Sequence, residues 1–260
     1  MKIILKTERD LEAMRPAGAV ATRVLDEVSA WIRPGVTTRE VDQYAASRIK
    51  HYGAKSAFFG YRNYPCQICI SVNDEVVHGL ANERRLQFGD IVSLDVGVVF
   101  KGFIGDTART VAVGGCSLEA QRLMDVTERA LFEGIARAVS GNRVSDISRA
   151  VQNYVESNEF SVVREFVGHG VGRSVHEEPQ VPNFVDPGAK DTRLLPGMTL
   201  AIEPMVNAGG PGVKILKDGW TAVTQDGSLS AHFEHTVLIT RSEPEILTCV
   251  EKMPSKLKVR

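Results

Sequence analysis

The sequence predicts an α+β domain built from two similar halves. In each half, two helical segments come before a run of strands, an order that favours helices packed on a sheet. Similar segments also recur at a nearly constant offset along the chain. No stretch resembles a linker between independent domains, so we expect a single domain over residues 1–260, with halves at about 1–112 and 117–250.

Two pairs of segments carry the repeat. Residues 86–95 resemble residues 194–203 at an offset of 108, and in both a turn glycine is followed six residues later by a carboxylate, Asp95 or Glu203, that ends an apolar strand. Upstream, residues 34–41 match residues 140–147 at an offset of 106. Similar halves tend to place a site on their shared axis, so we expect carboxylates from both halves to meet centrally.

Capping signals place the helices of the first half. The pattern Thr7-x-x-Asp10 predicts the start of a helix that runs through residues 31–32, before Pro34-Gly35 ends it. Thr37-x-x-Glu40 has the form of a capping box for a second helix, which Gly53 ends.

In the second half, Ser117 predicts the cap of a helix from Leu118 to about Val139, and Ser145 the cap of one that ends near Glu159. Segments rich in strand-forming residues follow the helices of both halves: Gln67–Val77, Asp90–Ala112, Val162–His169, Thr199–Val206 and Trp220–Thr240.

Two acids in one of these segments give the strongest functional signal. Asp95 and Asp106 lie eleven residues apart, and a hairpin that turns at Phe100-Lys101 would set them directly opposite each other. Their Cβ atoms would then be roughly 4.5–5.5 Å apart, where like charges repel. The flanking run Ile91–Leu94 is too apolar for a solvated face, and a buried carboxylate must be paired, protonated or metal-bound. The pair therefore indicates divalent metal, with room for two ions about 3.5–4 Å apart.

Four further segments carry candidate ligands. They are the glycine-rich run Gly168–Pro179 with His169 and His176, the acid Glu203 at a strand end, the segment His232–His235 with Glu234 between two histidines, and His78 after an apolar strand. Spacing alone does not choose among His232, Glu234 and His235, and His78 by itself suggests a structural residue. So many oxygen ligands favour a hydrolytic centre with two metal ions over an iron site of two histidines and one carboxylate.

Composition excludes several classes of function. The chain has 31 basic and 32 acidic residues, and this balance gives no strong electrostatic field that would attract nucleic acid or an anionic membrane. We expect the basic end at residues 252–260 to be solvated.

The sequence shows no segment for membrane insertion or secretion. No apolar run approaches the roughly 18–20 residues that span a bilayer, and residues 1–8 are too short an apolar patch for a secretory signal. Four cysteines are too few for a disulfide framework and suit a reducing cytoplasm. Cys66-x-x-Cys69 lacks the second pair that a structural zinc needs.

Taken in order, these motifs resemble the type I methionine aminopeptidases of the pita-bread fold. The resemblance covers nearly the whole chain. It is carried by Tyr61–Pro65, Cys69, Ser71, Asn73, Val76–Gly79, Asp95–Gly97, Gly105–Thr110, Gly168–Gly172, His176–Pro179, Ile202–Pro204 and Phe233–Thr236. It implies one catalytic domain in which the helices pack outside a curved, mainly antiparallel sheet. It also implies removal of the N-terminal methionine from nascent proteins and peptides with a small second residue, by water or hydroxide that metal activates.

The resemblance also implies roles for individual residues. The metal ligands would be Asp95, Asp106, His169, Glu203 and Glu234, with Asp106 and Glu234 bridging two ions, and this selects Glu234 over its neighbouring histidines. Glu203 would move the proton to the leaving amine, His176 would stabilise the oxyanion and His78 would orient the next amide. Tyr61, Tyr64, Cys69 and Trp220 would line the pocket for the methionine side chain.

Two residues depart from the family pattern. Val175 stands where many relatives have phenylalanine, which predicts a thinner pocket wall, and His232 stands where glutamine is usual.

The nearest rival is an X-Pro aminopeptidase or prolidase of the same fold, for which we expect a sizeable N-terminal domain that this chain lacks. A non-catalytic binding protein of this fold is a second alternative, disfavoured because all five ligands are present. Cobalt, iron, manganese and zinc all suit the ligands, and the resemblance implies a cytoplasmic monomer with weak docking to the ribosome.

Overall fold

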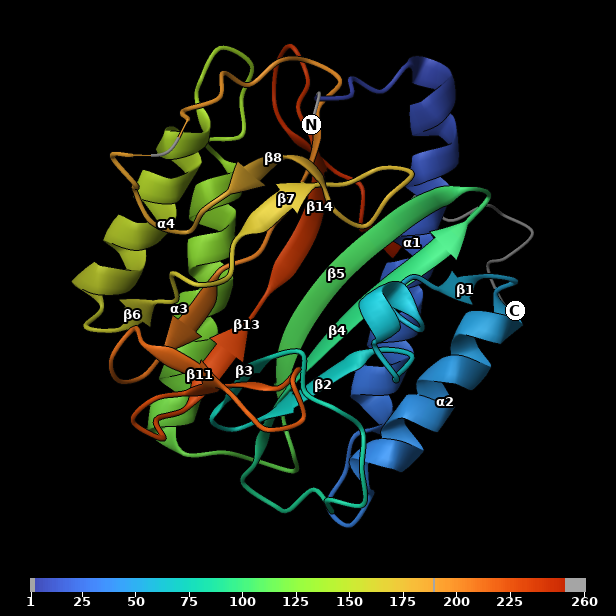
Figure 1. Cartoon of the computed structure of the whole chain (residues 1–260), viewed down its shortest axis with the longest axis vertical. Coiled ribbons are helices and arrows are strands. Elements are labelled where there is room, and N and C mark those ends of the chain that lie inside the picture. Colours follow the sequence, from blue (N-terminus) through green and yellow to red (C-terminus); the bar gives the residue numbers. More distant parts are fainter. Residues whose placement is uncertain (1–2, 189, 251–260) are drawn as a thin grey trace.

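The computed structural model describes residues 3–188 and 190–250 (Figure 1). The basic end at residues 252–260 lies outside these ranges. The helices are α1 (Glu8–Trp31), α2 (Thr38–His51), α3 (Leu118–Ile135) and α4 (Val144–Ser157), with a short 3-10 turn, η1, at Tyr61–Asn63. None of the described helices is long and apolar enough to cross a membrane.

Three of the four predicted helix starts are confirmed. The Thr7 hydroxyl accepts a hydrogen bond from the Asp10 backbone N–H at 3.2 Å, Thr37 does the same for Glu40 at 3.1 Å, and Ser117 for Ala120 at 3.1 Å. In the first two helices the N3 carboxylate also accepts from the backbone N–H of its threonine, which completes a capping box.

The prediction for α4 was wrong. Its N-cap is Arg143, whose backbone N–H donates to Asp146 at 2.9 Å, and Ser145 already lies inside the helix. The Ser145 backbone N–H and hydroxyl both donate to Asp191, at 3.1 and 3.0 Å. A carboxylate 46 residues away in the sequence therefore caps this helix, which local sequence does not reveal. The α3 helix also ends at Ile135, four residues before the predicted end.

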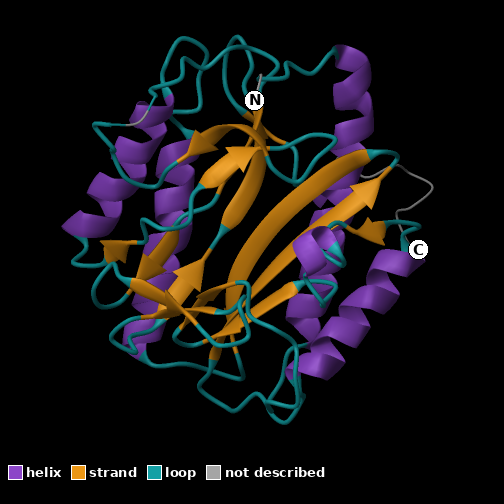
Figure 2. Ribbon diagram, viewed as in Figure 1, coloured by secondary structure: helices purple, strands orange, loops and turns teal. Residues whose placement is uncertain are grey.

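One antiparallel sheet forms the centre of the molecule (Figure 2). Its strand order is β1-β4-β5-β14-β9-β7-β8, with β2 on β4 and β15 on β14. The strands are β1 (Lys55–Ser56), β2 (Cys69–Val72), β4 (Ile91–Phe100), β5 (Phe103–Ala112), β7 (Gly168–Gly170), β8 (Glu177–Val181), β9 (Thr199–Ile202), β14 (Glu234–Leu238) and β15 (Glu245–Ile246).

Two small antiparallel sheets complete the β structure. One contains β13 (Ser230–His232), β10 (Met205–Asn207) and β6 (Ser161–Val162), and the other β11 (Val213–Ile215), β12 (Ala222–Thr224) and β3 (Glu75–Val77). The large sheet joins the two halves of the chain, because β5 of the first half pairs with β14 of the second.

The register of the β4–β5 hairpin differs from the prediction. The turn residues are Lys101 and Gly102, with φ of 52° and 78°, and two positive φ angles are typical of the type I′ turns of two-residue hairpins. Asp106 therefore pairs with Gly97, and Asp95 with Ala108. The pairing is shifted by two residues, an even number, so both acids keep the same face although they are diagonal neighbours rather than opposite.

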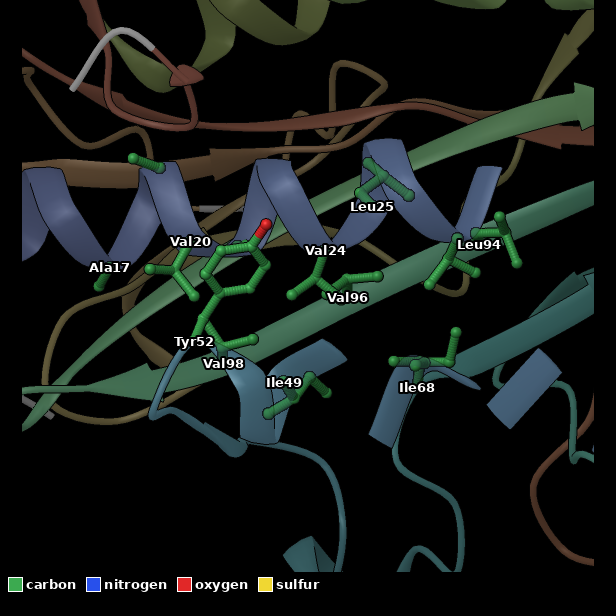
Figure 3. Close-up of a cluster of buried hydrophobic side chains, with 14 of the residues drawn as sticks. Ala17, Val20, Val24, Leu25, Ile49, Tyr52, Ile68, Leu94, Val96 and Val98 are labelled. Carbon is green, nitrogen blue, oxygen red and sulfur yellow. The ribbon is translucent and has the colours of Figure 1, made fainter. Parts of the chain in front are cut away.

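The helices cover the sheet in two pairs, α1 with α2 and α3 with α4 (Figure 1). Figure 3 shows the first cluster, in which Val20 and Val24 of α1 meet Val96 of β4 and Ile49 of α2. A second cluster joins α3 and α4 to β9 and β14. Burying each such side chain stabilises the fold by about 1.5–3 kcal/mol. Both clusters lie between the helices and the sheet, and the opposite face of the sheet is left for polar side chains.

Similar backbone contacts occur in both halves. The Gly35 N–H donates to the Leu86 carbonyl at 2.7 Å, and the Gly141 N–H donates to the Leu194 carbonyl at 3.1 Å. Isolated bridges join residues 37 and 85 in the first half and residues 143 and 193 in the second. In each half, the chain before the second helix is thus tied to the turn that leads into a central strand.

Candidate metal centre

Five side chains lie on one face of the central sheet, four of them within β4, β5, β7 and β14 and the fifth, Glu203, directly after β9. Ala108 pairs with Asp95 on one side and with Glu234 on the other, so these two acids share a cross-strand row. Asp106 is two residues from Ala108. Glu203 and His169 join this face through Ala201, which pairs with both His169 and Thr236. The face opposite the helices therefore carries every residue predicted as a metal ligand.

These side chains border one cavity of about 290 Å³. Asp106, His169 and Glu234 offer ligand atoms that all lie within 4.8 Å of one another, and all three are buried. Glu203 adjoins them, with its Oε1 3.3 Å from the His169 Nε2, and Asp95 lines the same cavity. The structure thus gathers all five residues, including the acid that sequence spacing alone could not choose.

Each of the four carboxylates in this cavity has a buried oxygen without a hydrogen-bond partner in the described part of the chain. Within the described residues, Asp95 Oδ1, Asp106 Oδ1, Glu203 Oε1 and Glu234 Oε1 are buried and accept no hydrogen bond. Burial raises the pKa of all four groups, and the neighbouring carboxylates raise the pKa of Asp106, Glu203 and Glu234 further. Buried charges of one sign are unstable unless a cation is shared among them.

The donor set fits divalent metal. Carboxylate oxygens and one neutral imidazole are ligands that manganese, iron, cobalt and zinc accept. The His169 imidazole is available in its neutral form, because burial lowers its pKa to about 3. Its Nδ1 lies 2.9 Å from the Gly170 carbonyl, which orients the ring and leaves Nε2 toward the carboxylates.

The two other predicted histidines, His176 and His78, also border the cavity. The His176 ring centroid is 4.3 Å from that of His169, and its Nδ1 lies 2.9 Å from the Tyr61 hydroxyl. His78 follows β3 with a φ of 60°, a conformation that non-glycine residues adopt rarely and often at functional sites. Burial lowers the pKa of His78 to about 4, so it is neutral near pH 7.

The predicted pocket residues also border the cavity. The Tyr64 ring meets the Trp220 ring edge-on at 5.0 Å, and its hydroxyl donates to the Gly79 carbonyl at 2.8 Å. Cys69 is buried, and burial raises the pKa of its thiol, so it acts as an apolar wall. Val175 is buried beside them. Cys66 packs in the same apolar cluster but does not border the cavity.

The structure separates the two histidines that flank Glu234. His232 is buried with its Nε2 3.8 Å from Glu203 Oε2, whereas the His235 Nδ1 lies 2.8 Å from the Thr248 hydroxyl on the opposite face of β14. Strand alternation explains the difference between Glu234 and His235. His232 is therefore a neighbour of the centre, and His235 is not.

Part of the cavity wall consists of residues that the sequence did not predict. Phe58, Arg62, Glu165, Phe166 and Val167 also border it. Phe166 contacts the His78 ring edge-on at 5.2 Å. Residues 165–167 lie in the predicted strand segment before His169, which gave no sign that they reach the site. For Arg62 the signal was present, because it lies between Tyr61 and Tyr64, which were assigned to the pocket.

Comparison with known proteins agrees with this arrangement. The model of metallopeptidase family M24 matches residues 12–241. The chain is 51% identical over 249 residues to a methionine aminopeptidase of Clostridium perfringens, covering 96% of this chain and all of the relative. It is 50% identical over 248 residues to methionine aminopeptidase 1 of Bacillus subtilis, covering 95% of this chain and all of the relative.

Solved structures lead to the same group. The crystal structure of a methionine aminopeptidase from Thermotoga maritima matches with a TM-score of 0.92 and 46% identity, covering 95% of this chain and 99% of that one. The chain therefore belongs to metallopeptidase family M24, in the group of the type I methionine aminopeptidases with the pita-bread fold.

Proposed function

We propose that this protein removes the N-terminal methionine from peptides and nascent proteins, with a preference for a small second residue. The observation that carries the proposal is the convergence of the five predicted metal ligands, from both halves of the chain, on one cavity. The names of the relatives support the same activity.

Two divalent ions, of cobalt, iron, manganese or zinc, would be held by the five side chains. Asp95 would bind one ion, His169 and Glu203 the other, and Asp106 and Glu234 both. Unpartnered oxygens on all four carboxylates support this assignment. When bound, such ions polarise a carbonyl group and lower the pKa of water enough to supply hydroxide near neutral pH.

The protein's own groups would then guide the substrate and its protons. Glu203 would carry a proton to the leaving amine, a role that suits a carboxyl group whose pKa burial raises. His176 would donate a hydrogen bond to the carbonyl oxygen as negative charge develops there, and His78 would orient the amide of the second residue. Tyr61, Tyr64, Cys69 and Trp220 would surround the methionine side chain.

The two halves would work as one catalytic domain, residues 1–112 and 117–250, because neither alone holds the five ligands. We further propose that the protein is a cytoplasmic monomer that meets nascent chains at the ribosome through weak contacts. Four unpaired cysteines and a formal net charge of −1 support a reducing compartment and the absence of strong electrostatic partners.

A peptide assay tests the proposal. Protein purified without added metal is analysed for its elements, then incubated with Met-Ala-Ser or Ala-Pro in the presence of manganese, cobalt, iron or zinc. We expect release of methionine from Met-Ala-Ser only, with activity rising to a maximum as metal occupancy rises. Cleavage of Ala-Pro in place of Met-Ala-Ser would instead identify an X-Pro peptidase, and no cleavage with metal bound would identify a binding protein.

A further inference from the structure

A buried ion pair lies directly behind His176. His176 borders the cavity, whereas the carboxylate of the next residue, Glu177, binds Lys6 with an Nζ–Oε2 distance of 2.6 Å. The Lys6 and Glu177 side chains are only 4% and 7% exposed. Because burial removes charged groups from water at a high cost, such a pair on the edge of a site is unusual and needs an explanation.

The second oxygen of Glu177 closes the loop that carries His176. Glu177 Oε1 accepts hydrogen bonds from the backbone N–H groups of Arg173 and Ser174, at 2.9 and 3.3 Å. The carboxylate thus holds both ends of the five-residue segment 173–177 together. His176 is the residue immediately before the point at which this segment is fixed.

Lys6 connects that carboxylate to the frame of the protein. Its backbone N–H donates to the Gly197 carbonyl at 2.8 Å, in the turn before β9, and its ammonium group also donates to the Ile4 carbonyl at 3.2 Å. The chain before α1 and the turn before β9 therefore both anchor the loop. A charged link between rigid parts restricts the positions that Glu177 can adopt.

Gly172 shows how closely the loop packs against the pair. A Cβ atom at this position would lie 2.6 Å from both Glu177 Oε1 and Lys6 Cε. The Gly172 carbonyl accepts from the Ile104 N–H at 2.8 Å, which fixes the start of the loop to β5. The loop is consequently held at Gly172, at Arg173 and Ser174, and at Glu177.

We propose that Glu177, charged and held by Lys6, is a positioning residue that fixes His176 for catalysis. The inference rests on the proposed function, because His176 must act on the substrate for its position to matter. Tyr61 holds the Nδ1 side of the His176 ring, and Glu177 holds the backbone that carries it. A misplacement of a catalytic group by about 1 Å can cost about a hundredfold in rate, so a modest loosening of this loop should be measurable.

Two variants and one matched control test the inference. Glu177→Gln keeps the size of the side chain but removes the charge that Lys6 needs, and Lys6→Met removes the ammonium group without touching the backbone of the loop. Glu27→Gln is the control, because Glu27 binds both Arg48 and Tyr52 in a partly buried cluster of three side chains on the helical side of the sheet. Steady-state constants for Met-Ala-Ser with saturating manganese are measured in the wild-type and His176→Ala backgrounds.

We expect Glu177→Gln and Lys6→Met each to lower kcat about tenfold, with KM changed less than twofold, and Glu27→Gln to lower the melting temperature without changing kcat. In the His176→Ala background, neither Glu177→Gln nor Lys6→Met should lower kcat further, since a group that acts through His176 has nothing left to position. If Glu177→Gln does not fold, Lys6→Met carries the test alone.

Two results would overturn the inference. One is a kcat within twofold of wild type for Lys6→Met, and the other is a tenfold loss that persists in full without His176. If the wild-type protein releases no methionine at all, the proposed function fails first and the inference with it. An active wild-type protein whose variants behave like Glu27→Gln leaves the proposed function intact and refutes only the role of Glu177.

Discussion

Glu203 Oε1 lies 3.3 Å from His169 Nε2, and neither side chain carries a compensating charge for the other near neutral pH. Burial lowers the pKa of His169 to about 3, so the imidazole is neutral there. The neighbouring His232, 3.8 Å from Glu203 Oε2, is neutral for the same reason. Glu203 therefore finds no positive charge on either histidine, and burial favours its protonated form.

Replacing Glu203 by Gln should lower kcat for Met-Ala-Ser by about a hundredfold or more, because loss of a general acid or base typically costs 10²–10⁴-fold. The circular dichroism spectrum should not change, since the amide has nearly the same shape. Glu83→Gln is the control, as its ion pair with Arg39 is exposed and should contribute little. Equal turnover for the two variants would remove Glu203 from the proposed proton transfer.

Metal-free protein should lose stability as the pH rises above 7. Burial raises the folded-state pKa of Asp95 to about 7 and those of Asp106, Glu203 and Glu234 well above their unfolded values, so the folded protein binds more protons and stability falls until each group ionises. The buried histidines act in the opposite direction, but their effect fades as the pH rises through about 6.5, the pKa of histidine in the unfolded state, and is small about one unit higher.

The measurement is the urea midpoint of chelator-treated protein at pH 7, 8 and 9. We expect the midpoint to decrease along this series, and Asp106→Asn combined with Glu234→Gln to flatten the dependence. Manganese added at pH 8 should raise the midpoint of wild-type protein, because it binds only the folded state. A midpoint that rises between pH 7 and 9 would contradict the assignment of these carboxyl groups.

Val175→Phe should narrow the proposed methionine pocket. Val175 is buried in the cluster that contains Tyr64 and Cys69, so a larger ring there would take space from the cavity. One methylene group in such a pocket changes discrimination by about tenfold to two-hundredfold. We expect the ratio of kcat/KM for Met-Ala-Ser over Leu-Ala-Ser to rise about tenfold, and an unchanged or lower ratio would place Val175 outside the selective wall.

Gly102→Ala should lower the free energy of unfolding by about 1 kcal/mol, because alanine is strained in the left-handed region that glycine tolerates. Gly102 has a φ of 78°, and the nearest atom to an added Cβ is at 3.7 Å, so strain rather than collision is expected. Lys101→Asn is the matched variant, since asparagine suits the first position of this turn and should stabilise it. Urea denaturation of both proteins measures the difference.

The sequence predicted the sheet face of the acids better than their pairing. Asp95 and Asp106 both belong to apolar strands. The predicted register differed from the true one by two residues, an even number, so it still placed both acids on the correct face of the sheet. The register itself depended on which two residues form the turn. The preference of type I′ turns for glycine at the second position was the available signal, and it favoured Lys101-Gly102 over Phe100-Lys101.

The features that the sequence did not predict depend on contacts between residues far apart in the chain. The start of α4 depends on Asp191, and the choice between Glu234 and His235 depends on the pairing of β14 with β5 and β9. Only the family resemblance selected Glu234 from sequence. The Lys6–Glu177 pair joins residues 171 positions apart, which no local pattern signals.

Because the proposed ligands come from both halves of the chain, division of the protein between β5 and α3 would yield two inactive fragments. The first would hold Asp95 and Asp106, and the second His169, Glu203 and Glu234. Since β5 and β14 are neighbouring strands, reassociation of the fragments would rebuild the centre across the cut. Such a divided enzyme would report encounter between any two proteins fused to its parts, through the return of peptide cleavage.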